Sequence, residues 1–356
     1  MIASYIRNAV ALGTTAFTLA FVGFMDASPS LYLYDRFFVN EQRLKNFFEG
    51  KTIWITGASS GVGKELALRA ARYGVKKLIL TGRSPERLQI VADSCSNQDE
   101  VFLRQPSLST ISVLPLDMTA SDEEFNHAFS ALEMILGGDN LDCILLNAGR
   151  GQLKTADTTS SSTTSEIFQI NALAPIALSQ QLLQRGILNK TKGRQQLVVT
   201  SSVGALVGLP LSSSYAASKH ALHGYFNTLR SEKTWLDIKL ICPGTIDTPF
   251  HNKHVGGSGK TANNPSSDNK NQTRKKGKLK MPINRFVSLY MSSLLLGSGE
   301  QWIAEQPTLF GLYLNRHFPG IFQLGLAKIG PLRIKAWEEG KDLYDPKTWK
   351  DLGKKK

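Results

Sequence analysis

The sequence predicts a doubly wound α/β fold, in which helices cover both faces of a parallel sheet of six to seven strands. From Lys51 onward, short runs that are apolar throughout alternate with helical stretches. Such runs are typical of strands covered on both faces, as in a parallel sheet. The predicted strands are residues 52–56, 78–81, 112–116, 143–147, 197–201 and 239–242, with 302–304 as a possible seventh.

The charge of the chain is concentrated in two segments. The net charge is +13, of which residues 251–280 contribute +7 and residues 341–356 contribute +3. The rest is close to neutral, so the charge indicates a solvated loop and tail, and nucleic acid is not an expected partner. Cys95, Cys143 and Cys242 have neither disulfide nor zinc spacing, and no metal site is predicted.

This distribution gives three parts. Residues 1–50 are predicted to form an N-terminal apolar anchor helix and a linker, 51–340 a single dinucleotide-binding domain, and 341–356 a basic tail. Asn8 to Met25 has no charged residue over 18 positions, which is just long enough for a helix to cross a bilayer core of about 30 Å. A retained anchor is the leading interpretation; a cleaved signal and a helix packed on the protein are the alternatives.

A glycine-rich turn, TGASSGVG at Thr56 to Gly63, lies between the first predicted strand and a helix. Gly57 permits the tight turn, Gly61 lets the backbone approach a diphosphate, and Gly63 lets the helix pack on the strand. The helix N-terminus offers unpaired N–H groups and the positive end of its dipole to an anion. Ser59 and Ser60 add hydroxyl donors. The turn therefore predicts a nucleotide site.

The end of the second predicted strand indicates which dinucleotide binds. An acidic residue here would favour the ribose hydroxyl of NAD, whereas a basic residue suits the 2′-phosphate of NADP. Arg83 occupies this position, so we expect NADP(H) as the cofactor, with NAD(H) as the alternative. Arg83 could also be an ordinary surface arginine without a role in binding. Asp117 and Met118 follow the third strand, where they could border an adenine ring, although Asp117 could equally cap a helix.

Polar residues follow the fourth and fifth predicted strands. Asn147-Ala148-Gly149 is a small-residue exit that would let a cofactor cross the sheet edge, or a plain turn. Asn171 lies in an apolar helix, where a buried amide needs partners; the backbone alone could satisfy it.

Tyr215 and Lys219 are four residues apart, so on a helix they share one face, where the ammonium is expected to lower the phenol pKa. A tyrosine so tuned can exchange a proton near neutral pH. Ser202 could hydrogen-bond the same substrate oxygen. A Tyr-x-x-x-Lys pair alone is usually a surface pair, and its place after the fifth strand and downstream of TGASSGVG favours function.

Residues 51–250 resemble the short-chain dehydrogenase/reductase family, which has a Rossmann-type fold. TGASSGVG matches the family's TGxxxGxG, Asn147 to Gly149 its NAG, Tyr215 to Lys219 its YxxxK, and Pro243-Gly244 with Thr248 its PGxxxT. Leu146 departs from the commoner NNAG. The C-terminal end, with EQWIAEQP, resembles the membrane-associated dehydrogenase/reductase member 7 subfamily and is also similar to hydroxysteroid dehydrogenases.

The resemblance implies a catalytic set of Asn171, Ser202, Tyr215 and Lys219, in which Tyr215 protonates a carbonyl oxygen that Ser202 polarises. Lys219 would lower the tyrosine pKa and bind the nicotinamide ribose, and Asn171 would hold a water that links Lys219 to solvent. The expected cofactor-binding residues are Gly57, Ser59, Ser60, Gly61, Val62, Gly63, Arg83, Asp117, Met118, Asn147, Ala148, Gly149, Tyr215, Lys219, Pro243, Gly244, Ile246 and Thr248.

The remaining segments bear on partners. Residues 251–280 are basic and nearly free of apolar side chains, which indicates a flexible insertion, or a lid over the substrate. Residues 308–329 are apolar but interrupted, so they are expected to pack on the core or a second subunit, or to enter a membrane interface.

The leading hypothesis is an NADP(H)-dependent oxidoreductase that interconverts a carbonyl and a secondary alcohol on a small apolar substrate of steroid, retinoid or lipid type. It would act at a membrane, by resemblance the endoplasmic reticulum, with a homodimer possible. The alternatives are a catalytically silent NADPH-binding scaffold or regulator, and a lipid- or nucleic-acid-binding module built on the basic loop.

Overall fold

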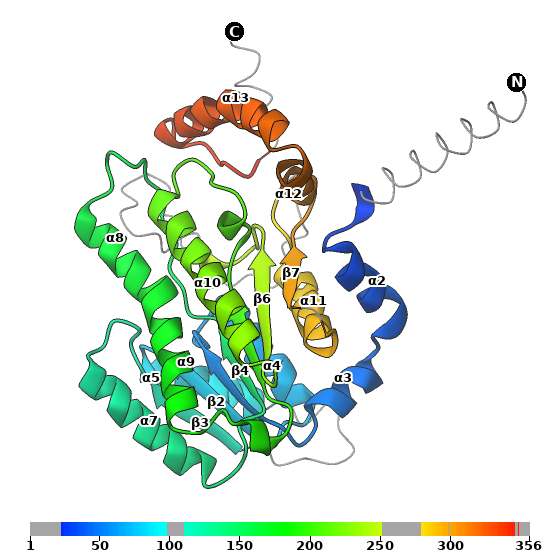
Figure 1. The fold of residues 1–356 in the computed structure, drawn as a ribbon, viewed down its shortest axis with the longest axis vertical. Helices are drawn as coiled ribbons and strands as arrows, with labels where there is room; N and C mark the ends of the chain where they lie inside the picture. Colours follow the sequence, from blue (N-terminus) through cyan, green and yellow to red (C-terminus); the bar gives the residue numbers. More distant parts are fainter. Residues whose placement is uncertain (1–22, 98–109, 251–278, 298, 346–347, 349–356) are drawn as a thin grey trace, which may run out of the picture.

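The computed structural model describes residues 23–97, 110–250, 279–297, 299–345 and 348. Their core is one parallel sheet of seven strands in the order β3-β2-β1-β4-β5-β6-β7, so the predicted doubly wound fold, including the seventh strand, is confirmed (Figure 1). The strands are β1 (Thr52–Thr56), β2 (Lys77–Gly82), β3 (Thr110–Pro115), β4 (Cys143–Leu146), β5 (Gln196–Thr200), β6 (Asp237–Pro243) and β7 (Glu300–Ile303).

The strand order reverses direction between β1 and β4. From β1 the chain runs outward through β2 to β3, and then returns to the other side of β1 for β4 to β7. At such a reversal the connections leave in opposite directions, which opens a crevice beyond the carboxyl ends of the strands. Ile53 pairs with both Leu78 and Cys143, so the glycine turn after β1 lies at this crevice.

Helices cover the sheet in two layers, because apolar side chains project from both faces of each central strand. One layer is α4 (Gly61–Arg72), α5 (Pro85–Ser96) and α11 (Ile283–Leu295), whose Leu66, Leu88 and Phe286 are fully buried. The other is α7 (Asp122–Leu136), α9 (Ala174–Gln184) and α10 (Ser213–Glu232). Shorter elements are α8 (Ser161–Phe168), the π-helix η1 (Gln169–Leu173), and the 3₁₀ turns η2 (Lys190–Lys192) and η3 (Val203–Ala205).

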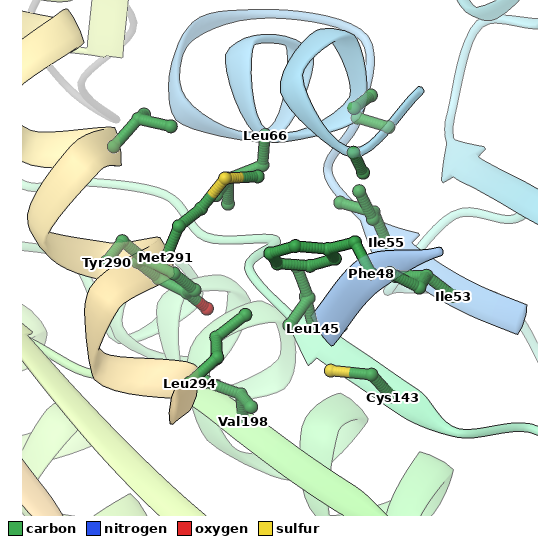
Figure 2. Close-up of a cluster of buried hydrophobic side chains, with 14 of the residues drawn as sticks. Phe48, Ile53, Ile55, Leu66, Cys143, Leu145, Val198, Tyr290, Met291 and Leu294 are labelled. Carbon is green, nitrogen blue, oxygen red and sulfur yellow. The ribbon is translucent and has the colours of Figure 1, made fainter. Parts of the chain in front are cut away.

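Two helices occupy residues 29–48 of the predicted N-terminal anchor and linker. They are α2 (Pro29–Phe38) and α3 (Glu41–Phe48), which lie beside α11 (Figure 1). Phe48 is fully buried in a cluster with Leu66, Leu145 and Met291 (Figure 2). Arg285 of α11 also pairs with Asp26 and Asp35, with N–O distances of 2.7 Å to each. Local sequence does not reveal partners so far away along the chain.

The C-terminal region forms α12 (Thr308–His317) and α13 (Pro319–Glu338), which lie beyond the carboxyl ends of β6 and β7 (Figure 1). Leu309 and Leu312 of α12 are buried, whereas Ile321, Leu324 and Ile329 of α13 are exposed. Among the residues described, no helix combines the length and the apolar character that a membrane span requires. Residues 1–22 of the predicted anchor, the 251–278 part of the basic insertion and most of the tail lie outside the described residues.

Candidate active site

The glycine turn joins the carboxyl end of β1 to the N-terminus of α4. A Cβ on Gly63 would lie 2.3 Å from the Gly57 carbonyl oxygen, and one on Gly57 would lie 2.9 Å from Ala148 Cα, so neither position can carry a side chain. Gly57 and Gly61 have φ of 68° and 57°, which favour glycine. Ser60 is the N-cap, and its side chain makes no capping hydrogen bond to any described residue. The first N–H groups of α4 therefore remain available to an anion.

The ends of β1, β4 and β5 are held together by three polar side chains. Thr56 Oγ1 accepts hydrogen bonds from the Asn147 and Ala148 N–H groups at 3.0 and 3.1 Å. Asn147 Nδ2 donates to the Thr56 carbonyl at 3.4 Å, and Thr200 donates to Asn147 Oδ1 at the same distance. Asn147 and Ala148 thus lie against the glycine turn.

Two arginines after β2 lie near the glycine turn, Arg83 directly after the strand and Arg87 at the start of α5. Arg83 is largely exposed, and its Nε lies 3.9 Å from a carboxylate oxygen of Asp117. Arg87, in the first turn of α5, donates to the Ser59 carbonyl at 3.4 Å. Gly82 packs on Ser59, because a Cβ there would lie 3.5 Å from the Ser59 hydroxyl. The structure therefore brings Arg83 and Arg87 to the same edge as Ser59.

Asp117 and Met118 follow β3. The Asp117 carboxylate accepts from the Thr119 N–H and hydroxyl, both at 2.9 Å. It does not cap the next helix, because Ser121 and Glu124 form a capping box at the start of α7, so the alternative of a helix cap is wrong. Met118 is buried in the cluster that covers one face of the sheet. Its side chain thus belongs to the core.

Asn171 lies in the π-helix η1 and is fully buried. Its side chain accepts from the Arg150 N–H at 2.8 Å, and donates to the Arg150 carbonyl at 2.9 Å and to the Ser218 hydroxyl at 3.2 Å. The Arg150 backbone supplies two of these partners and the Ser218 hydroxyl the third, so the backbone alone does not satisfy this amide. Asn171 also lies near Lys219, because a Cβ on Gly149 would be 3.4 Å from Asn171 Oδ1 and 3.7 Å from Lys219 Nζ. A link through water stays a prediction.

Ser202, Tyr215 and Lys219 meet where β5 ends against α10. A Cβ on Gly204 would lie 3.3 Å from Ser202 Oγ and 3.4 Å from Tyr215 Cε1, so these two side chains are neighbours. Lys219 Nζ lies 6.0 Å from the centre of the Tyr215 ring and donates to the Thr200 carbonyl at 2.9 Å. The predicted common face of Tyr215 and Lys219 on one helix is thus confirmed.

The protonation behaviour of this pair corrects the sequence-based expectation of a lowered tyrosine pKa. Burial raises the pKa of Tyr215 to about 12, although the Ser202 hydroxyl lowers it by hydrogen bonding to it. Burial also lowers the pKa of Lys219 to about 8. Both shifts have one cause, since each charged form loses solvation in the protein interior. Burial is the largest effect on the pKa of each of the two groups.

The segment after β6 returns to the glycine turn. Gly244 donates to the Ile303 carbonyl at 2.8 Å, and Ile246 forms an isolated bridge with Met281. Thr248 lies next to Gly61, because a Cβ added to Gly61 would be 3.8 Å from the Thr248 Cβ. Pro243 is buried at the end of its strand. Apart from Met118, whose side chain packs in the core, the predicted residues in the loops that follow the strands therefore lie along the carboxyl edge of the sheet.

Other residues at this edge escaped sequence reasoning. Thr200 supplies the carbonyl that accepts from Lys219. Arg87 lies near the same edge as Arg83. Its basic character, four positions after Arg83, is a pattern that could have identified it from the sequence. The ring of Phe250 lies 6.4 Å from that of Tyr215. Tyr344 is near enough to raise the pKa of Tyr215 further. No local pattern indicates these two contacts, because tertiary folding creates them.

The donor set fits a dinucleotide. The open N–H groups of α4 suit a diphosphate, the side-chain-free turn lets it approach the backbone, and Arg83 with Arg87 suits an additional phosphate. Lys219 and Tyr215 lie further along the same edge.

Sequence comparison places the chain in a family with this architecture. The sequence model of the short chain dehydrogenase family matches residues 51–256, so the chain belongs to that family of oxidoreductases. Dehydrogenase/reductase SDR family member 7 of Homo sapiens is 31% identical over 294 residues, covering 82% of this chain and 80% of the relative. Its counterpart in Mus musculus is 29% identical with 82% and 81% coverage. The predicted resemblance is confirmed for the family and for the member 7 subfamily.

Solved structures share the fold. An alcohol dehydrogenase from the archaeon Thermococcus sibiricus, in complex with 5-hydroxy-NADP, superimposes with a TM-score of 0.58. It is 21% identical, covering 72% of this chain and 97% of the other. A short chain dehydrogenase from Burkholderia cenocepacia, in complex with NADP, also gives a TM-score of 0.58, at 18% identity, with 78% and 98% coverage.

Proposed function

We propose that this protein is an NADP(H)-dependent oxidoreductase that interconverts a carbonyl and a secondary alcohol on an apolar substrate. The observation that carries the proposal is the meeting of Ser202, Tyr215 and Lys219 at the same sheet edge as the glycine turn. Family membership supports hydride transfer as the reaction class. The test is turnover of NADPH with a panel of steroid, retinoid and aromatic carbonyls; binding without turnover would favour the silent scaffold.

The proposed roles follow from the chemistry of each side chain. When bound, the reduced nicotinamide supplies a hydride. The Ser202 hydroxyl donates a hydrogen bond to the substrate oxygen, and the Tyr215 phenol transfers its proton to that oxygen as negative charge develops. The Lys219 ammonium stabilises the tyrosinate that remains. Because the pKa of Tyr215 is raised to about 12, the phenol stays protonated across the neutral range and is ready to act as the acid.

The preference for NADP(H) rests on Arg83 and Arg87. A charge-assisted hydrogen bond contributes about 1.5 to 3 kcal/mol, which is about tenfold or more in affinity. We expect Arg83→Ala to raise the KM for NADPH by at least about tenfold and to change the KM for NADH by less than about twofold. Arg72→Ala, at the far end of α4, is the matched control in steady-state kinetics with both cofactors. Equal effects on both cofactors would contradict the assignment.

We further propose that the protein associates with the endoplasmic reticulum membrane through the uncharged stretch at Asn8 to Met25, whose last residue, Met25, packs in the protein itself. The exposed Phe24 and the exposed apolar side chains Ile321, Leu324 and Ile329 of α13 support it. An apolar substrate would partition into the same membrane. We expect the full chain to stay with the membrane in alkaline carbonate. A chain that begins at Met25, which keeps α2 and the Asp26 and Asp35 partners of Arg285, serves as the comparison. Release of the full chain would contradict the proposal.

A further inference from the structure

Three consecutive residues at the end of β5 meet three residues on one stripe of α10. The stripe is Tyr215, Lys219 and His223, each four residues after the last, so they lie on the same side of the helix. Ser202 neighbours Tyr215, the Thr200 carbonyl accepts from Lys219 at 2.9 Å, and Ser201 Oγ lies 2.9 Å from His223 Nε2. Three residues at the end of β5 thus contact three residues of α10. Two of these contacts involve the proposed catalytic residues, and the third is made by His223.

Glu300 of β7 fixes the orientation of this imidazole. His223 Nδ1 lies 3.4 Å from one carboxylate oxygen of Glu300, and Trp302 Nε1 donates to the other at 2.7 Å. The hydrogen bond with His223 lowers the pKa of Glu300, so the carboxylate is ionised and accepts. Nδ1 therefore carries the proton in the neutral ring, and Nε2 accepts from the Ser201 hydroxyl.

The same imidazole also contacts the end of β6. Cys242 Sγ lies 3.6 Å from His223 Nε2, and it immediately precedes the Pro243-Gly244 segment of the site. The Ser201 N–H donates to the Ile241 carbonyl at 2.7 Å, which joins the ends of β5 and β6. His223 consequently joins α10, β5, β6 and β7 where the site is built.

A hydrolytic triad of serine, histidine and glutamate does not explain this arrangement. Ser201 is only 2% exposed, and its hydroxyl lies against His223 in the protein interior. Burial raises the pKa of the Cys242 thiol well above its usual range, which keeps it a neutral thiol and a poor nucleophile. The group therefore has the burial and the partners of a support for the neighbouring site.

We propose that His223, oriented by Glu300, is a positioning residue that fixes Ser202 relative to Tyr215 and Lys219. The proposal rests on the proposed carbonyl chemistry. Ser202 is the N-cap of η3, and its Oγ accepts from the Gly204 N–H at 3.0 Å. Because Ser201 immediately precedes it in the chain, the contact between Ser201 and His223 helps to fix the backbone of Ser202. A displacement of about 1 Å at a reacting group can lower a rate by about 10²-fold.

The test compares His223→Ala, Glu300→Gln and Ser201→Ala with the parent chain, using the best carbonyl of the panel. We expect His223→Ala to lower kcat by about tenfold or more, while the Kd for NADPH stays within about twofold. His223→Gln keeps a polar atom near the Nε2 position and is expected to recover most of the loss. Because the two partners act as one unit, the effects of Ser201→Ala and His223→Ala should not add.

The matched control is His220→Ala, since His220 lies on the exposed side of the same helix and contacts the Ala216 carbonyl. Its kcat should equal that of the parent. A His223→Ala variant that melts earlier yet keeps the parental kcat well below its melting temperature would overturn the positioning role.

A second measurement separates failure of this proposal from failure of the proposed function. If the parent chain turns over no carbonyl, the proposed function fails, and crystal structures of parent and His223→Ala then decide the positioning role alone. A shift of Ser202 Oγ by about 0.5 Å or more relative to Tyr215 is expected, since sites are held to about this tolerance. Superimposable Ser202 side chains would contradict it.

Discussion

Tyr215→Phe is expected to lower kcat for carbonyl reduction by about 10³-fold, within the range of about 10² to 10⁴ for loss of a general acid. The substitution removes the hydroxyl that neighbours Ser202 and retains the ring near Phe250. Because the glycine turn and the arginines are untouched, the Kd for NADPH should change by less than about twofold, as measured by fluorescence titration.

Tyr225→Phe on the same helix is the matched control, because Tyr225 packs against Phe226 of the core cluster and lies more than two helical turns beyond Tyr215. It should keep the parental kcat. A Tyr215→Phe variant with parental turnover would show that another group protonates the substrate oxygen.

Lys219→Met is expected to change the pH dependence of folding stability. The pKa of Lys219 is lowered from 10.5 to about 8 by burial, so between these values the unfolded chain binds one more proton than the folded chain. Burying the charged Lys219 therefore lowers the free energy of unfolding below pH 8. This destabilisation is lost as the pH rises from 8 to 10.5. A shift of this size corresponds to about 3 kcal/mol.

The measurement is denaturant unfolding of parent and variant between pH 7 and pH 10.5. The difference, parent minus variant, should rise by about 3 kcal/mol, because contributions from the buried cysteines and other tyrosines cancel between the two proteins. A difference that stays constant with pH would contradict a deprotonating Lys219. The variant should also lose turnover by about 10²-fold or more, because the tyrosinate loses its counter-charge.

Much of the fold follows from local sequence. The apolar runs at β1 and β4 are buried on both faces whatever their neighbours, and the close packing of Gly57 and Gly63 tolerates no side chain, so these residues carry their own signal. The spacing of Tyr215 and Lys219 likewise fixes a shared helical face.

Other features depend on distant partners and cannot be predicted from the sequence. The docking of α2 relies on Arg285 reaching Asp26 and Asp35, more than 200 positions away. The raised pKa of Tyr215 depends on how much water the fold removes, which spacing does not reveal. The role inferred for His223 requires Glu300 of β7, whose place at the sheet edge is known only once the strand order is known.

The most direct test of the central claim follows the hydride itself. The full chain would be incubated with NADPH carrying deuterium at both C4 positions and with the carbonyl panel, and the alcohol product analysed by mass spectrometry and NMR. The account predicts an alcohol with one deuterium on the carbinol carbon from the parent protein, and almost no labelled alcohol from Tyr215→Phe. Bound NADPH with no labelled alcohol from any carbonyl would contradict it.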